Sequence, residues 1–198
     1  VDIARGLRTR FTFEPTDEQT AVWSPDGTRL AYNARPKGYF DLFVKDAAGV
    51  GPERTLVSDT RNKTPLSWSP DGKVLLYSVG VSVVSNADVW QVPVDGSAPP
   101  SAFLQSPFNE TDARFSPDGR WVAYDHQMRQ AGWGLMLLAE HGQFVRALPG
   151  WRAIEFERNG SRLLAMQVRP ADDDGEDGWY ALLDLAAADD PGRGDPAG

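Results

Sequence analysis

The tetrapeptide Ser-Pro-Asp-Gly occurs three times in this chain, starting at residues 24, 69 and 116, so that the copies stand 45 and 47 residues apart. An aromatic residue precedes each copy, and a tyrosine stands five residues after each glycine. A fixed period in this range is typical of a repeat architecture. The aromatic residues are Trp23, Trp68 and Phe115, and the tyrosines are Tyr32, Tyr77 and Tyr124.

Each copy predicts a tight turn between two strands. Proline sets φ near the value that the second turn position needs, aspartate can bond the backbone ahead of it, and glycine tolerates a positive φ. We therefore interpret Asp26, Asp71 and Asp118 as turn residues. They are poor calcium ligands as a set, because calcium needs six or more oxygens at one point and one aspartate per repeat does not converge. We expect the preceding aromatic residues to pack between neighbouring repeats, because aromatic side chains bury large areas.

Around each turn, alternating apolar residues predict four short antiparallel strands in about 45 residues, which is the unit of a β-propeller blade. The expected strands are 20–24, 28–33, 40–45 and 54–57, then 66–69, 73–78, 88–94 and 102–105, then 113–116, 120–125, 132–139 and 144–148. A degenerate fourth unit follows. Its turn is residues 156–160, 41 residues after Phe115, Ala165 replaces the tyrosine, and the expected strands include 163–164 and 179–185.

We predict an all-β fold, a β-propeller of four-stranded antiparallel blades with about four repeats in a small or incomplete ring. The domain covers residues 1–185, divided into 1–19, 20–60, 61–107, 108–149 and 150–185. Residues 1–3 and 8–13 are expected to form two strands of a partial blade. Residues 186–198 form an acidic, Gly- and Pro-rich tail that we expect to be disordered. The chain begins with Val1, so we expect it to be processed or a piece of something longer.

The composition narrows the range of partners. The formal net charge of −8 argues against a general nucleic-acid binder and against docking on anionic lipid, both of which need a basic surface. The chain has no cysteine, which excludes disulfides, thiolate catalysis and zinc–thiolate sites. No apolar run approaches the ~18 residues of a membrane helix, so we expect no membrane insertion by this chain.

The turn motif, with its leading aromatic residue and the strand that ends in tyrosine, resembles the TolB-type, WD40-like β-propeller repeat family. Segments of the partial blade and of the first three units are similar to the propellers attached to bacterial serine/threonine protein kinases: residues 9–13, 23–27, 40–42, 75–77, 88–90 and 108–110. The resemblance implies protein contact in the cell envelope or an extracytoplasmic sensor domain, with a cytoplasmic location as the alternative. The family usually builds rings of six or more blades, whereas this chain holds four repeats at most.

We predict no catalytic residue, no cofactor and no metal site. The chain has no Gly-rich phosphate loop, no His-Arg-Asp string and no Gly-x-Ser-x-Gly elbow, so the kinase and peptidase chemistry found beside related propellers has no counterpart here. The acidic run at 172–177 lacks EF-hand spacing. The expected function is a non-catalytic protein-binding, scaffolding or sensor module. The alternative is a hydrolase that uses the propeller channel, which would require a pocket that gathers His126 with a carboxylate and a hydroxyl.

One end of the expected propeller is the candidate binding face, because loops that carry function gather there. The loops between blades (16–19, 61–64, 109–112 and 150–152) meet the loops at 35–40 and 126–130. We expect a protein or peptide partner at this end, and self-association through open blade edges. The predicted partner-binding residues are Tyr39, Phe40, Arg61, Lys63, Asn109, Glu110, His126, Trp151 and Arg152.

Overall fold

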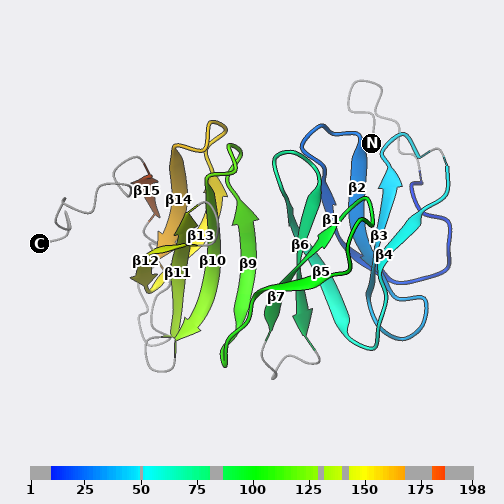
Figure 1. Cartoon of the computed structure of the whole chain (residues 1–198), viewed down its shortest axis with the longest axis horizontal. Helices are drawn as coiled ribbons and strands as arrows, with labels where there is room; N and C mark the ends of the chain where they lie inside the picture. Colours follow the sequence, from blue (N-terminus) through cyan, green and yellow to red (C-terminus); the bar gives the residue numbers. More distant parts are fainter. Residues whose placement is uncertain are drawn as a thin grey trace, which may run out of the picture.

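The computed structural model describes residues 10–49, 51–80, 87–128, 132–139, 143–167 and 180–185. These residues form four antiparallel sheets and no helix, and within each sheet the strands follow one another in sequence order. Figure 1 shows the sheets side by side along the long axis of the molecule, in the order of the chain. The predicted all-β propeller of about four blades is confirmed.

The first three blades have four strands each, and the fourth has three among the described residues. Blade 1 contains β1 (Glu18–Trp23), β2 (Arg29–Ala34), β3 (Asp41–Asp46) and β4 (Arg54–Val57). Blade 2 contains β5 (Asn62–Trp68), β6 (Val74–Gly80), β7 (Asp88–Pro93) and β8 (Ser101–Leu104). Blade 3 contains β9 (Glu110–Phe115), β10 (Trp121–Met128), β11 (Gly132–Ala139) and β12 (Phe144–Pro149). Blade 4 contains β13 (Trp151–Phe156), β14 (Arg162–Gln167) and β15 (Tyr180–Asp184).

The repeated turns close by the same hydrogen bonds in each of the first three blades. In the first, the Ser24 hydroxyl donates to Asp26 Oδ1 at 2.6 Å and accepts from the N–H of Arg29 at 2.9 Å. Asp26 Oδ1 also accepts from the N–H of Thr28, and Gly27 has a φ of 69°. The equivalent bonds are present at Ser69 and Ser116. The interpretation of the three aspartates as turn residues is therefore confirmed.

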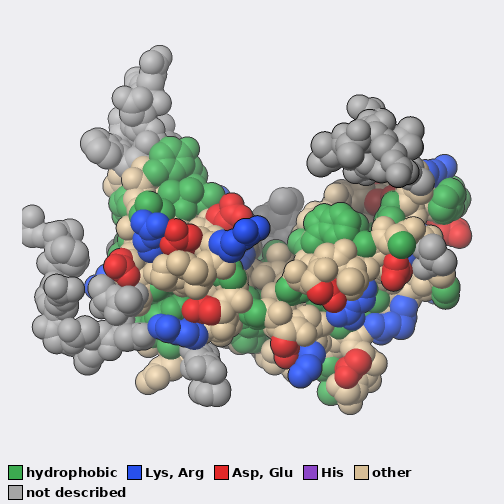
Figure 2. Space-filling view, turned by 90° about the horizontal axis from the view of Figure 1, so that it is seen from above, with side chains coloured by type: hydrophobic (Ala, Val, Ile, Leu, Met, Phe, Trp, Pro, Cys, Tyr) green, Lys and Arg blue, Asp and Glu red, His purple; other side chains and the backbone are tan. Residues whose placement is uncertain are grey.

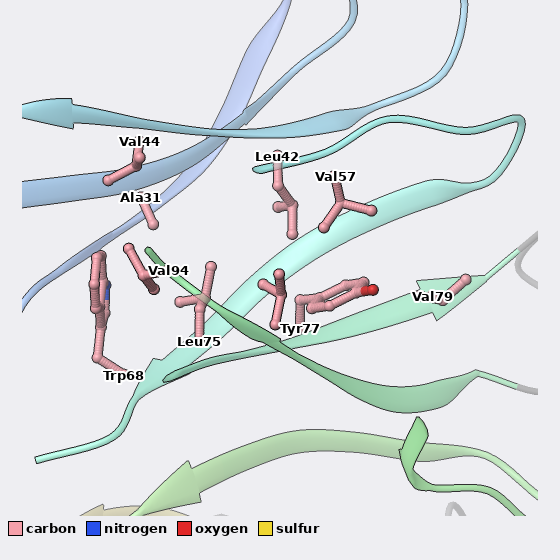
Figure 3. Close-up of a cluster of buried hydrophobic side chains, with 10 residues drawn as sticks. Ala31, Leu42, Val44, Val57, Trp68, Leu75, Tyr77, Val79 and Val94 are labelled. Atoms are coloured by element: carbon pink, nitrogen blue, oxygen red, sulfur yellow. The ribbon is translucent and has the colours of Figure 1, made fainter. Parts of the chain in front are cut away.

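The core lies between blades. Between blades 1 and 2, apolar side chains from β2 and β3 meet those of β6, with Trp68 at one end of the layer (Figure 3). Trp68 also donates its indole N–H to the Val22 carbonyl at 3.1 Å, and the Arg29 guanidinium lies 5.0 Å from the centre of its ring. Similar layers lie between blades 2 and 3 and between blades 3 and 4.

Two expectations at the N-terminal end are wrong. Trp23, predicted to pack between repeats like Trp68, is 62% exposed, because blade 1 has no described blade before it. Residues 10–13 form no strand. Phe11 instead packs edge-on against Tyr32, and its carbonyl accepts a hydrogen bond from Lys45 Nζ. The expected strand at 1–3, the acidic run at 172–177 and the tail at 186–198 lie outside the described residues.

The inner strands begin earlier than predicted. β5 starts at Asn62 and β9 at Glu110, whereas the pattern predicted loops at these positions. Each strand has a shift in its pairing register partway along, at Pro65/Ser67 for β5 and opposite Ala123/Asp125 for β9. Because such an irregularity interrupts the alternation of side chains, the polar residues before it read as loop in the sequence.

Candidate functional site

The candidate site is the end of the propeller opposite the Ser-Pro-Asp-Gly turns, called here the mouth. It contains the connections β2–β3 and β10–β11 and the starts of β5, β9 and β13. Of the nine predicted site residues, the structure places five in strands rather than loops: Lys63 in β5, Glu110 in β9, His126 in β10, and Trp151 and Arg152 in β13. The mouth is thus built largely from strand ends, which hold side chains more rigidly than loops do.

The same pair of hydrogen bonds connects neighbouring blades at two places in the mouth. The side-chain oxygen of Asn62 accepts from the N–H of Phe40 at 3.0 Å, and that of Asn109 accepts from the N–H of Ala87 at 2.7 Å. The next residue in each inner strand donates its own N–H back, Lys63 to the Phe40 carbonyl and Glu110 to the Ala87 carbonyl. Asn109 also bonds Gln127 through its amide nitrogen. These paired bonds hold each inner strand against the preceding blade.

Lys63 is fully buried beneath the mouth. Its ammonium lies 3.0 Å from Asp41 Oδ1 and 2.9 Å from Asp59 Oδ1, and it also donates to the carbonyls of Asp59 and Arg61. Burial opposes ionisation of Asp59, but hydrogen bonds from Arg61 and Lys63 outweigh that effect and lower its pKa to about 2. The Arg61 guanidinium bonds the same carboxylate and lies 4.9 Å from the centre of the Trp90 ring. These charges hold the first blade junction together.

Glu110 is buried at the next junction and receives two polar contacts on one oxygen. Its Oε1 accepts from the Ser106 hydroxyl and lies 3.1 Å from His126 Nδ1. Its Oε2 is buried without a hydrogen-bond partner among the described residues. The His126 ring stands edge-on to Phe108, with ring centres 5.4 Å apart. A carboxylate, a hydroxyl and an imidazole are thus gathered, as the hydrolase alternative required.

The geometry of this group differs from that of a nucleophilic triad. In a triad the serine hydroxyl donates to the imidazole, which deprotonates it during attack, and the acid bonds the other ring nitrogen. Here the Ser106 hydroxyl and the His126 ring both bond the same oxygen of Glu110. The hydroxyl proton is therefore directed to a carboxylate and not to the imidazole. In this geometry the Ser106 hydroxyl and the His126 ring both pack against a buried acid.

Arg152 joins blades 3 and 4. Its Nε donates to Asp125 Oδ2 at 2.6 Å, its Nη2 donates to Asp112 Oδ2 at 2.9 Å, and its guanidinium lies 5.3 Å from the centre of the Trp133 ring. Burial raises the pKa of Asp125, against the opposing effect of hydrogen bonds from Arg152 and the Ala153 N–H. Asp112 has a φ of 54°, a strained value for a residue with a side chain.

A hollow of about 280 Å³ opens beside this cluster, and Arg114 is one of its lining residues. Arg114 also borders a second hollow of about 320 Å³, between β1, β5 and β9, with Thr20, Thr64 and Leu66. Both hollows are lined mainly by residues of the inner strands β1, β5, β9 and β13. Among the described residues Arg114 has no ion-pair partner. Arg114 and Asp125 were not predicted as site residues, because nothing in the local sequence pattern separates them from other charged strand residues.

The aromatic residues predicted at the mouth differ in exposure. Tyr39 is 42% exposed. Phe40 is partly buried beneath the Arg35 guanidinium, which lies 5.3 Å from the centre of its ring. Trp151 is partly buried against the core between blades 3 and 4.

Among the described residues, no group of three or more acidic or histidine side chains is arranged to hold a metal ion. The residues that the structure describes also contain no helix that is long and apolar enough to span a membrane.

Comparison with known proteins supports the fold. No family model matches the chain. The uncharacterized protein Atu1656 of Agrobacterium fabrum is 29% identical over 106 residues, which is 52% of this chain and 35% of that protein. A candidate TolB from Agrobacterium tumefaciens superposes with a TM-score of 0.63 at 18% identity, over 82% of this chain and 60% of the other.

Two further solved structures have the same fold. TolB from Acinetobacter baumannii superposes with a TM-score of 0.65 at 17% identity, over 89% of this chain and 43% of the other. A prolyl endopeptidase gives a TM-score of 0.61 at 14% identity, over 86% of this chain and 27% of the other. The chain thus spans about a third of the curated relative and at most 60% of these solved structures. At these identities the likeness establishes the propeller fold alone.

Proposed function

We propose that this chain is a non-catalytic binding module, whose mouth and adjoining concave hollows hold a protein or peptide segment. The observation that carries the proposal is the pairing of charges at the mouth. The three junction clusters, centred on Lys63, Glu110 and Arg152, pair their charges within the molecule, and this includes Arg152, Asp112 and Asp125 where they line a hollow. A face whose charged groups are already paired with one another is held in place before a partner arrives, and preorganisation of this kind favours binding.

Among the residues that the structure describes, Tyr39 and Arg114 are available to a partner on this side of the molecule. Tyr39 is exposed at the mouth, and tyrosine is among the residues that dominate interface energies. Arg114 borders both hollows without an ion-pair partner among the described residues. The pair therefore favours a segment that carries an apolar or aromatic anchor and a carboxylate. We place this role outside the cytoplasm, as the resemblance to TolB-type propellers implies.

The test is site-specific cross-linking from the mouth. A photoreactive amino acid at position 39 should capture a partner in cell-envelope extracts, and the capture should be lost when Arg114→Ala or Trp151→Ala is added. The matched control is position 144. Phe144 is an exposed aromatic at the start of β12, the end of that strand away from the mouth. Equal capture from positions 39 and 144, or capture that survives both substitutions, would refute the mouth as the binding face.

A hydrolase is the second candidate, favoured by one observation, the meeting of Ser106, Glu110 and His126. Because the hydroxyl bonds the acid and not the imidazole, we expect no hydrolysis of chromogenic esters or short peptides above the rate in buffer. Activity that disappears in both Ser106→Ala and His126→Ala, with the melting temperature unchanged, would establish the hydrolase and overturn the binding proposal.

A further inference from the structure

Lys63 and Glu110 occupy the same position in the repeat. Each lies five residues before the aromatic residue that leads its turn, and each pairs with the residue two places after the tyrosine of the next strand, Val79 and His126 respectively. Each also donates its N–H to a carbonyl of the preceding blade, and both side chains are buried. The junction between blades 1 and 2 can therefore be compared residue by residue with the junction between blades 2 and 3.

The junction between blades 1 and 2 buries a cation among acids. The Lys63 ammonium lies 3.0 Å from an oxygen of Asp41 and 2.9 Å from an oxygen of Asp59. A lysine paired with carboxylates keeps its charge across the neutral pH range, because nearby negative charges favour the protonated form. The balance of charges at this junction is therefore the same at pH 6 and at pH 8.

The junction between blades 2 and 3 has the opposite arrangement, with a buried acid in place of the buried cation. Among the described residues, no lysine or arginine bonds Glu110, and its Oε2 has no hydrogen-bond partner. A buried carboxylate without a cation is costly, because its charge has left water without compensation. The residues at the positions of Lys63, Asp59 and Asp41 are here Glu110, Ser106 and Asp88.

His126 is the one described ionisable side chain that bonds Glu110. Its Nδ1 lies 3.1 Å from Glu110 Oε1, and its side chain is 17% exposed. An imidazole gains or loses its proton between about pH 5 and 8, so His126 changes charge in a range where a lysine does not. The net charge buried at this junction therefore depends on pH.

The other ionisable groups near His126 are a neutral tyrosine and two acids. The ring centre of Tyr124, on the same strand, lies 6.4 Å from that of His126. Burial, and then the charge of Glu110, raise the pKa of Tyr124 to about 12, so this phenol stays neutral between pH 6 and 8. On β11 the residue opposite His126 is Gly134, which has no charge. The two acids have hydrogen-bond partners of their own, and they are Asp88 on β7 and Asp125 on β10.

We propose that Glu110 and His126 form a pH-sensitive latch between blades 2 and 3. While the imidazole is protonated, the buried carboxylate has a cation beside it and holds the connection 105–109 through the Ser106 hydroxyl. This stabilisation is present at pH 6 and is lost as the pH rises toward 8 and the imidazole loses its proton. The start of β9 and the connection before it then open more readily. The latch does not depend on the proposed binding function.

The turn end of the molecule offers no comparable group. Figure 2 looks at the end that carries the turns, and its coloured surface shows acidic and basic side chains but no histidine. Exposed pairs of such charges contribute little to stability. The second histidine of the chain, His141, lies outside the described residues. A response between pH 6 and 8 at the start of β9 is therefore a specific signature of the latch.

Amide hydrogen exchange of the 198-residue chain at pH 6 and pH 8, corrected for the intrinsic exchange rate, tests the latch. The reporter is the N–H of Glu110, which donates to the Ala87 carbonyl across the junction, and the matched control is the N–H of Lys63, which donates to the Phe40 carbonyl. Protection of the Glu110 N–H should fall by roughly 10- to 100-fold from pH 6 to pH 8, the effect of losing one hydrogen bond between charged groups. Protection of the Lys63 N–H should not change.

Two substitutions remove the partners in turn. His126→Gln should give at both pH values the low protection that the wild type has at pH 8. Glu110→Gln should give the same high protection at both pH values, because no buried charge remains. Arg129→Gln and His141→Gln, which change the other basic residues near these strands in the sequence, should keep the wild-type response.

Three results would overturn the latch. The first is a Glu110 N–H that is protected equally at pH 6 and pH 8 in the wild type. The second is a pH response that survives in His126→Gln or in Glu110→Gln. The third is a response that disappears in Arg129→Gln, because that result assigns the balancing charge to Arg129 and not to His126.

Discussion

Replacing Lys63 with methionine tests whether the charges under the mouth stabilise the fold. The Lys63 ammonium is fully buried and has two carboxylate and two carbonyl partners at 2.7 to 3.1 Å. Methionine fills much of the same volume but leaves the buried Asp41 without its cation. Removing one partner of a buried ion pair costs about 3–5 kcal/mol, because the remaining charge is uncompensated. We expect Lys63→Met to lower the free energy of unfolding by that amount.

Urea unfolding followed by tryptophan fluorescence measures the change, and a double-mutant cycle assigns its cause. Asp41→Asn removes the buried charge while the Ser58 hydroxyl still has an acceptor at that side chain. The double variant Lys63→Met, Asp41→Asn should therefore lose less free energy of unfolding than the two single variants lose together. The difference should be roughly 1–3 kcal/mol. The control is Lys73→Met. Lys73 is 78% exposed and pairs with Asp71 at 3.5 Å, so its loss should cost no more than about 1 kcal/mol. If the two lysine variants lose equal stability, or the double variant is simply additive, the reasoning is wrong.

The turns provide three further predictions. The pKa of Asp26 is lowered from 3.8 to about 2, first by the Ser24 hydroxyl and then by the Thr28 N–H. Its stabilising contribution is therefore present above about pH 4 and lost as the pH falls toward the folded pKa, and Asp26→Asn should flatten the fall in melting temperature over that window. Gly72→Val should destabilise by roughly 1–3 kcal/mol in urea unfolding, because Gly72 has a φ of 68°; an unchanged midpoint would contradict the turn assignment. Gly160→Ala should cost more than Gly27→Ala by calorimetry, although both glycines have positive φ: a Cβ at Gly160 would meet the Asp118 carboxylate at 2.6 Å, whereas nothing lies within 4 Å at Gly27. Equal losses would show that only backbone strain matters.

The sequence alone predicted the repeat unit, the turn chemistry and the order of strands. These properties depend on residues close together in the chain. Ser24, Asp26 and Gly27 close their turn with bonds that span five residues at most. Even the degenerate fourth turn was recognisable from its Asn159-Gly160 pair. In the structure Asn159 accepts from the Ser161 N–H as the aspartates do at the other turns, and Gly160 has a φ of 75°. The local hydrogen bonds and the backbone conformation of a turn are determined by a few neighbouring residues.

The environment of each side chain at the mouth was decided by the tertiary structure. The local pattern predicts that Lys63 and Glu110 are polar loop residues, but both are buried in the structure. Their partners Asp41 and His126 lie 22 and 16 residues away in the sequence, so the local pattern does not reveal these contacts. Trp23 and Trp68 precede the same tetrapeptide, yet one is exposed and the other is packed between blades. A repeat encodes the two faces of each blade, but whether a face is covered depends on which sheet lies against it. That contact joins residues more than 40 positions apart, such as Trp68 and Val22, and no local pattern determines it.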